Sequence, residues 1–192
     1  MQEDEFARFF AALDLEADDR VRDFVMLALL TGARKRNLLS MCWSDVNLDR
    51  KLWIIAAEES KNGRPQSVAL TAPELEILTR RHKSRKTDFV FPGVGSTGHF
   101  VEPKRAWKRI LKRAGISDFH VHDLRHSMAS WMANTGADVS LIKSALNHLD
   151  IKTTMNVYVH TVNDAERKAR ERAHEFMLGH KTNKSRFRIV RN

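Results

Sequence analysis

The chain has 192 residues and a mass of 22.1 kDa, enough to bury a hydrophobic core in one domain, with room for a small appendage. Its 33 Lys and Arg against 24 Asp and Glu give a net charge of +9, which favours a polyanionic partner, either nucleic acid or an anionic membrane surface. The longest apolar run, residues 24–30, is too short to span a bilayer, and the acidic start is wrong for a signal peptide. The single cysteine, Cys42, excludes an internal disulfide and a cysteine-rich zinc site. We therefore expect a cytoplasmic protein that does not use a membrane.

The first half of the chain predicts helices around one β-hairpin. Residues 18–32 carry apolar side chains at helical spacing behind two aspartates that can cap, and the pattern stops at a glycine. Residues 52–70, LWIIAAEESKNGRPQSVAL, change to strand character around an Asn-Gly turn, so we expect a hairpin with Lys61 at its tip. A helix over residues 71–83 follows, with a threonine cap and a proline in its first turn. Residues 85–99 are rich in glycine and predict a loop.

The next predicted helix, residues 102–115, has two distinct faces. Its apolar stripe predicts packing against the core and consists of Trp107, Ile110, Leu111 and Ala114. Its other face stacks basic side chains at four-residue intervals, namely Lys104, Arg105, Lys108, Arg109, Lys112 and Arg113. A charged face of this kind is commonly a solvated surface. Because only Glu102 interrupts the six cations, contact with a nucleic-acid backbone is the prediction that we carry forward.

The second half of the chain predicts further helices and a basic end. Two helices are expected at residues 123–134 and 138–147, followed by a short segment with Tyr158 and by a charged helix at 164–178. Residues 179–192 contain no acidic side chain and predict a flexible basic tail. The whole pattern predicts a mainly α fold with a small antiparallel sheet of about three strands, in one domain that ends at residue 178.

The stretch HVHDLRHS raises the question of a metal site. His122 and His126 are four residues apart, a spacing that can bind zinc. However, Asp123 stands where a zinc hydrolase carries glutamate, and no carboxylate cluster indicates a two-metal nuclease. We therefore expect no catalytic metal and no cofactor. For His126 we favour a structural role beside the expected buried stripe of this helix, which consists of Leu124, Met128 and Trp131.

His122 and Arg125 indicate half of a phosphate clamp instead. They lie at a helix N-terminus, where free N–H groups favour an anion and a guanidinium can match two phosphate oxygens. Arg34, at the turn after the first buried helix, and Lys61 are candidates for the other cations. Tyr158, the only tyrosine, is the candidate nucleophile. Because its phenol is only about one part in a thousand ionised at pH 7, it needs a base or local positive charge.

These residues match a known family pattern in order. In that pattern an arginine follows a T-G-x turn, a lysine lies on a β-hairpin, and H-x-x-R precedes an L-G-H segment and a tyrosine about ten residues later. The chain offers TGAR, SKNGR, HDLRH, LNH and YVH within residues 5–175, and so resembles the catalytic domain of the tyrosine recombinases, the phage integrase family. Asn147 replaces the usual glycine of L-G-H, so we expect the packing of that helix end to differ. Asn37 replaces a common glutamate, and we expect this change to affect the support of the site residues more than the reaction itself. The six matching positions are Arg34, Lys61, His122, Arg125, His148 and Tyr158.

The resemblance implies a role for each matching position. The tyrosine would attack a DNA phosphodiester and form a 3′-phosphotyrosyl bond without a metal, while Arg34 and Arg125 would stabilise the non-bridging oxygens. His122 would move the tyrosine proton, and Lys61 would protonate the departing 5′ oxygen. His148 would orient the phosphate. The implied architecture is that of the catalytic domains of DNA breaking-rejoining enzymes.

The resemblance also implies partners and a task. The substrate would be double-stranded DNA, and the full-length protein would act on it as a homotetramer. An isolated catalytic domain could be a monomer. The expected task is integration or excision of a phage or mobile element. The family's core-binding domain normally precedes the catalytic domain, and nothing precedes residue 1, so we expect an excised catalytic domain.

Three other functions stay open on the sequence alone. The stretch ADVSLIKSALNHLDIKTTMNVYVH also fits two short helices around a turn, as in a helix-turn-helix regulator that binds DNA without cutting it. That alternative leaves the lone tyrosine, Lys61 and the paired arginines unexplained. A protein with the recombinase fold that only binds DNA is the second alternative, and a hydrolytic phosphodiesterase is the third.

Overall fold

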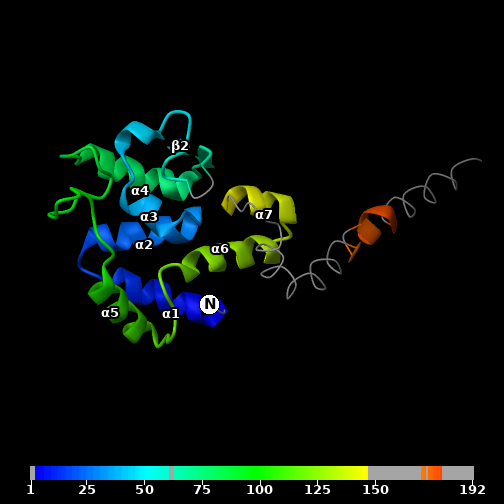
Figure 1. Ribbon diagram of the computed structural model, residues 1–192. Helices are drawn as coiled ribbons and strands as arrows, with labels where there is room; N and C mark the ends of the chain where they lie inside the picture. The colour runs from blue at the N-terminus through cyan, green and yellow to red at the C-terminus, as the bar shows by residue number, and fades with distance from the viewer. Residues whose placement is uncertain (1–2, 61–62, 147–169, 172, 179–192) are drawn as a thin grey trace, which may run out of the picture.

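The computed structural model describes residues 3–60, 63–146, 170–171 and 173–178 (Figure 1). This part is mainly helical with one three-stranded antiparallel sheet, as the sequence predicts. Its elements are α1 (Glu3–Asp14), α2 (Asp19–Thr31), α3 (Lys35–Leu39), η1 (Trp43–Asp45), β1 (Val46–Asn47), β2 (Leu52–Ile55), β3 (Gln66–Ala69), α4 (Ala72–Lys83), α5 (Lys104–Ala114), α6 (Asp123–Asn134) and α7 (Val139–Leu146). Among these described helices, a membrane-spanning segment is not found. The predicted tail, residues 179–192, lies outside the described residues, as do residues 164–169 and 172 of the predicted helix at 164–178, while residues 170–171 and 173–178 are helical.

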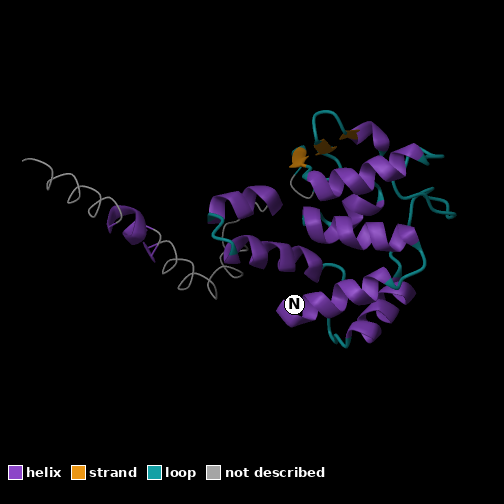
Figure 2. Cartoon of the chain, turned by 180° about the vertical axis from the view of Figure 1, so that it is seen from behind, coloured by secondary structure: helices purple, strands orange, loops and turns teal. Residues whose placement is uncertain are grey.

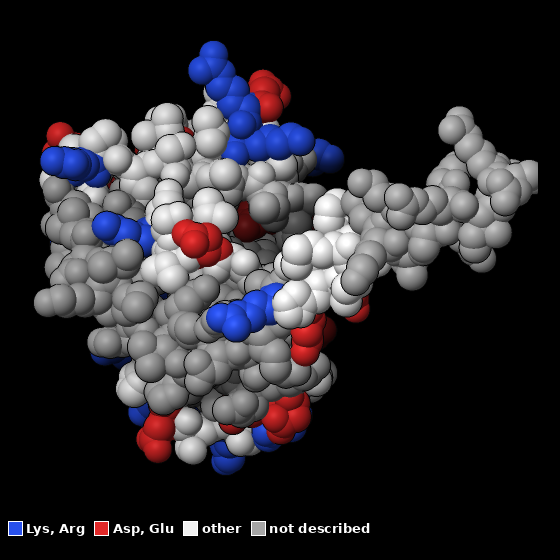
Figure 3. All heavy atoms as spheres, turned by 90° about the vertical axis from the view of Figure 1, so that its right-hand side faces the viewer, with Lys and Arg blue, Asp and Glu red and all other residues white. Residues whose placement is uncertain are grey.

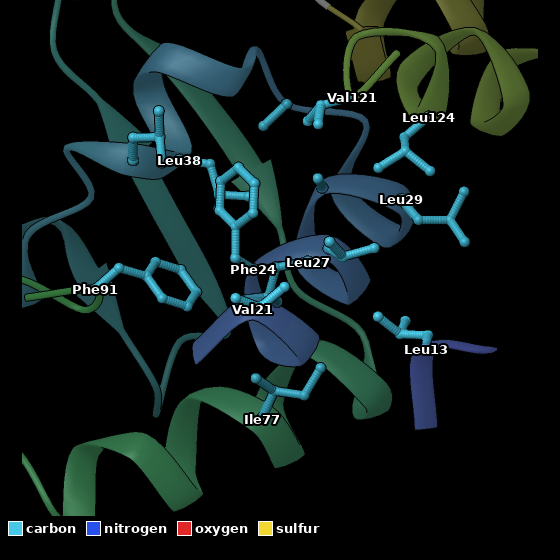
Figure 4. Close-up of a cluster of buried hydrophobic side chains, with 14 of the residues drawn as sticks. Leu13, Val21, Phe24, Leu27, Leu29, Leu38, Ile77, Phe91, Val121 and Leu124 are labelled. Carbon is cyan, nitrogen blue, oxygen red and sulfur yellow. The ribbon is translucent and has the colours of Figure 1, made fainter. Parts of the chain in front are cut away.

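Helix α2 lies at the centre of the hydrophobic core. It contacts α3, α4 and α6, while α1 packs against α5 on the opposite side of the molecule from α4 (Figures 1 and 2). Apolar residues occupy most of the circumference of α2, which is why neighbours can cover it on several sides. Figure 4 shows the side chains that converge around it, among them Leu13, Phe24, Leu27, Leu38, Ile77, Phe91 and Leu124. The end of this buried helix is therefore held firmly in place.

The predicted β-hairpin is confirmed as β2 and β3, and the second strand lies within one residue of the predicted run at 67–70. Strand β2 pairs with both β1 and β3, and the register sets Trp53 opposite Val68 and Ile55 opposite Gln66. The connection between β2 and β3 therefore runs over residues 56–65, of which 61–62 lie outside the described residues. Alternate residues of each strand face the core, so cross-strand packing fixes the register and the point where pairing stops.

Local capping signals explain where several helices begin and end. The Asp18 carboxylate accepts the backbone N–H of Arg20 at 2.9 Å and starts α2. Thr71 and Glu74 form a capping box at the start of α4. Helix α5 ends at Gly115, whose φ of 65° is left-handed. These predicted helix ends are confirmed.

The structure differs from the prediction where α1 meets α6. Helix α1 is not among the predicted elements, although its phenylalanines recur at helical spacing. The prediction of a buried stripe on α6 is wrong for Met128 and Trp131, which are only half-buried. Trp131 packs edge-on against Phe6 of α1 at a ring-centroid distance of 5.2 Å. Both half-buried side chains line an open apolar hollow of about 330 Å³ with Phe6, Phe10, Leu29 and Leu30.

Candidate active site

Arg125 is a buried guanidinium that joins three helices. It lies in the first turn of α6 and is 4% exposed. Its Nη1 group donates to the carbonyl oxygen of Gly32, which follows α2, at 2.6 Å, and its Nη2 group donates to the carbonyl oxygen of Leu146, the last residue of α7. Burial, together with the charge of Arg34, lowers the pKa of Arg125 to about 10, so the group is still protonated at neutral pH. A full positive charge is thus fixed in an interior position.

The TGAR turn delivers Arg34 to the same region. The Thr31 hydroxyl donates to the Leu27 carbonyl at 2.5 Å and accepts the Ala33 N–H at 3.1 Å, which closes the end of α2. Gly32 then takes a φ of 58°, and a Cβ built there would lie 2.7 Å from Cδ2 of Leu146. The glycine is needed for both its backbone conformation and its close contact with α7.

Arg34 and Arg125 form a pair of neighbouring like charges. Arg34 is half-buried at the start of α3, and burial lowers the pKa of its guanidinium. Its charge also acts on Arg125. Two cations held close together in a poorly solvated place repel each other, and a bound anion would relieve that repulsion. The pair is therefore suited to bind a phosphate group.

His122 stands beside this pair at the start of α6. It occupies the N-cap position with an exposed side chain. Partial loss of solvent lowers the pKa of its imidazole, and the charges of His126, Arg125 and Lys35 act in the same direction. The ring is therefore mostly neutral at pH 7, the form that can accept a proton.

Lys61, His148 and Tyr158 lie outside the described residues. Described residues near two of them in the sequence contact elements of the site region or residues next to those elements. Leu146, which accepts a hydrogen bond from Arg125, precedes His148 by two positions. Ser60 and Gly63 bracket the segment with Lys61, and the Ser40 hydroxyl after α3 donates to the neighbouring Glu59 carboxylate at 3.4 Å.

The six basic side chains of α5 have two different environments. Arg109 binds the buried carboxylate of Glu16 through two hydrogen bonds of 3.0 and 2.6 Å, and Arg113 lies 3.8 Å from the same carboxylate. The hydrogen bonds from Arg109 hold the pKa of Glu16 below its ordinary value. These two arginines thus stabilise the link between α1 and α2. The other four are exposed, and none of them forms an ion pair within the described part of the chain: Lys104, Arg105, Lys108 and Lys112.

Figure 3 shows how charged side chains are distributed on one face of the molecule. On the face in Figure 3, the coloured part carries small separate groups of basic and acidic side chains rather than one basic patch. The α5 face lies on the side of the molecule away from α7 (Figures 1 and 2). The described residues on the face in Figure 3 therefore do not form one broad basic surface.

Lys35 and His126 lie near the site but are not among the predicted site residues. Lys35, next to Arg34, donates to Glu102 at 2.7 Å and contributes to the lowered pKa of His122. His126, for which we predict a structural role, is exposed and meets the His122 ring edge-on at a centroid distance of 5.3 Å. The four-residue spacing of the two histidines is the sequence signal for this contact. Among the described residues there is no cluster of three or more His, Cys, Asp or Glu side chains that could hold a metal.

Residues 1–165 match the phage integrase family, so the chain belongs to this family, the tyrosine recombinases. The integrase of Salmonella phage P22 is 32% identical over 139 residues, which cover 67% of this chain and 36% of that protein. The tyrosine recombinase XerC of Staphylococcus aureus is 29% identical over 181 residues, which cover 90% of this chain and 60% of that protein. The chain thus spans between 36% and 60% of the length of these two curated relatives.

Solved structures share the fold. The catalytic domain of bacteriophage HP1 integrase aligns with a TM-score of 0.64 and 22% identity, over 84% of this chain and 86% of that domain. The Tn1549 transposon integrase in complex with a circular intermediate DNA aligns with a TM-score of 0.75 and 17% identity, over 90% of this chain and 65% of that one. The predicted architecture, that of the catalytic domain of a DNA breaking-rejoining enzyme, is therefore confirmed.

Proposed function

We propose that this chain is the catalytic domain of a site-specific recombinase that cleaves and rejoins double-stranded DNA through Tyr158. The observation that carries the proposal is the pair formed by Arg34 and Arg125, with His122 beside it. Two guanidinium groups held close together suit a phosphodiester, which brings one negative charge and several acceptor oxygens.

Cleavage is a phosphoryl transfer in which one P–O bond forms as another breaks. The Tyr158 oxygen attacks phosphorus, its proton passes to the neutral His122 imidazole, and the electron pair of the broken bond leaves on the 5′ oxygen. Lys61 gives that oxygen a proton, so a 3′-phosphotyrosyl bond and a free 5′-hydroxyl result. Rejoining is the reverse attack by a 5′-hydroxyl and needs no external energy source, because the phosphodiester energy stays in the covalent bond.

The arginine pair has its largest effect in the transition state. Negative charge on the non-bridging oxygens increases as phosphorus becomes five-coordinate, and fixed donors stabilise that charge without reorganising. The carbonyls of Gly32 and Leu146 orient Arg125 before DNA arrives, which provides such a fixed donor. His148 would add a hydrogen bond to the same phosphate.

The biological task that we propose is integration or excision of a phage or mobile element in the cytoplasm. The similarity to the phage P22 integrase supports it, although XerC and the Tn1549 integrase are also relatives or structural neighbours. The protein would act on DNA as a homotetramer together with a core-binding domain. The catalytic domain would comprise residues 1–178, and four exposed basic residues of α5 would contact the DNA backbone, namely Lys104, Arg105, Lys108 and Lys112.

Retention of labelled DNA in a denaturing detergent gel separates this proposal from its rivals. A recombinase keeps the DNA covalently attached on a suicide substrate. A helix-turn-helix regulator or a non-cutting binder releases intact DNA, and a phosphodiesterase releases cleaved DNA. Release of all DNA by a folded, DNA-binding chain would contradict the proposal.

A further inference from the structure

We infer that His122 and His126 form a two-histidine site for Zn²⁺ or a similar divalent transition-metal ion, and that occupancy of this site inhibits cleavage. The metal would be an inhibitor rather than a cofactor. The inhibition rests on the proposed function, since it requires His122 to act in the reaction, whereas the binding does not.

The geometry of the two rings fits a shared ion. They lie one helical turn apart at the start of α6, with centroids 5.3 Å apart and planes at 86° to each other. Two imidazole nitrogens bound tetrahedrally to zinc at about 2.0–2.1 Å place their ring centroids roughly 5 Å apart. Both side chains are exposed, so an ion can reach them from solvent without a change in the fold. Small rotations of the two side chains would complete the site.

The surrounding charges permit a cation at this position. The Lys35 ammonium is paired with Glu102 at 2.7 Å, and the Arg125 guanidinium points to the carbonyls of Gly32 and Leu146. The Asp123 carboxylate provides a compensating negative charge next to His122. Metals bind the neutral form of an imidazole ring.

Occupancy would affect the reaction through one nitrogen lone pair. A metal bound to His122 uses the lone pair that would otherwise accept the Tyr158 proton. Water would fill the remaining coordination positions, because only two protein ligands are present. The expected result is slower cleavage without loss of the arginine pair that binds DNA.

Direct binding tests the site without using catalysis. Zn²⁺ is titrated into the intact chain by calorimetry, and the same titration is made with His126→Gln and with His120→Gln. His120 is the matched control, because it belongs to the same stretch and its side chain is 83% exposed. Loss of a second-shell partner already weakens metal binding by about 10- to 100-fold, so His126→Gln should weaken it at least about tenfold and His120→Gln should not. Equal affinity in the wild type and His126→Gln would overturn the site.

Cleavage assays test the inhibition. At pH 7.5, Zn²⁺ should slow adduct formation on a suicide substrate in the wild type, and a chelator should restore the rate. His126→Gln should cleave at the wild-type rate without metal and resist Zn²⁺. Binding at the pair with no effect of Zn²⁺ on cleavage would overturn the inhibition. A wild-type chain that forms no adduct even with chelator would instead count against the proposed function, while the titration alone would still decide the site.

Discussion

Arg125 donates a hydrogen bond from Nη1 to the carbonyl oxygen of Gly32 at 2.6 Å, although the two residues are 93 positions apart in the chain. The Nη2 group of the same guanidinium donates to Leu146. One side chain therefore connects the end of α2 to the end of α7, and the turn that carries Arg34 lies against it. The guanidinium to which we assign phosphate binding therefore also holds these elements together.

Arg125→Lys should therefore reduce both activity and stability. An ammonium cannot reproduce the planar fork, so we expect the cleavage rate to fall about 10²- to 10³-fold. The free energy of unfolding should fall by about 1–3 kcal/mol, because buried carbonyls lose their donors. Single-turnover cleavage and urea unfolding measure the two effects, and Arg36→Lys, on the exposed side of α3, is the control. Wild-type cleavage by Arg125→Lys would contradict this role.

Gly32→Ala should destabilise the fold for two separable reasons. The left-handed φ of 58° costs an alanine about 1–2 kcal/mol, and the new Cβ would lie 2.7 Å from Leu146. Gly63→Ala measures the first cost alone, because its φ is 60° and no atom lies within 4 Å of a Cβ there. Gly95→Ala is the neutral control, with open space around its Cβ. Thermal unfolding should rank Gly32→Ala as the most destabilised, and equal losses for Gly32→Ala and Gly63→Ala would refute the packing argument.

The rate of adduct formation should depend on pH through His122. Because its pKa lies below the ordinary 6.5, the rate in a chelator-containing buffer should be constant at neutral pH and fall only below that value. The folded state also favours the neutral His122 ring and is stabilised by it. That stabilisation is fully present above the ordinary pKa of 6.5 and is lost as the pH falls through the lowered pKa of the folded state. His126→Gln removes a neighbouring charge and should move the inflection to higher pH, whereas His120→Gln should not. An inflection above 6.5 in the wild type would exclude this assignment.

Neighbouring basic residues of α5 should give opposite phenotypes. Lys108→Ala should leave the free energy of unfolding unchanged and should reduce the salt dependence of DNA affinity by about 0.9 in log–log slope, as expected for one lost phosphate contact. Arg109→Ala should lower the free energy of unfolding, because it leaves the buried Glu16 carboxylate with only the more distant Arg113. Salt-dependent DNA binding and urea unfolding are the measurements. An unchanged salt slope for Lys108→Ala would remove α5 from the DNA interface.

Sequence patterns predicted the parts of the fold that depend on neighbouring residues. The ends of α2, α4 and α5 follow from caps such as Asp18 and Gly115, which act within a few positions. The strand register did not follow from the sequence, because the pairing of Trp53 with Val68 is decided by packing across strands. The salt bridge between Arg109 and Glu16 was also not predicted, because the two residues lie 93 positions apart in the sequence.

The site shows the same division. The order of residue types predicted that Arg34, His122 and Arg125 belong together, and these three do lie in one region. The sequence did not predict that Arg125 is held by backbone carbonyls, because only the folded chain brings Gly32 and Leu146 to it. The same is true of the edge-on contact between His122 and His126, which needs the helix as well as the spacing.

The most direct test of the central claim is to identify the atom that becomes bonded to DNA. The chain is incubated with a suicide substrate, the adduct is digested, and the peptide that carries the nucleotide is sequenced by mass spectrometry, alongside Tyr158→Phe as the matched variant. We predict a 3′-phosphotyrosyl bond at Tyr158 and no adduct with Tyr158→Phe, which should still bind DNA. An adduct on another residue, or an undiminished adduct with Tyr158→Phe, would contradict the account.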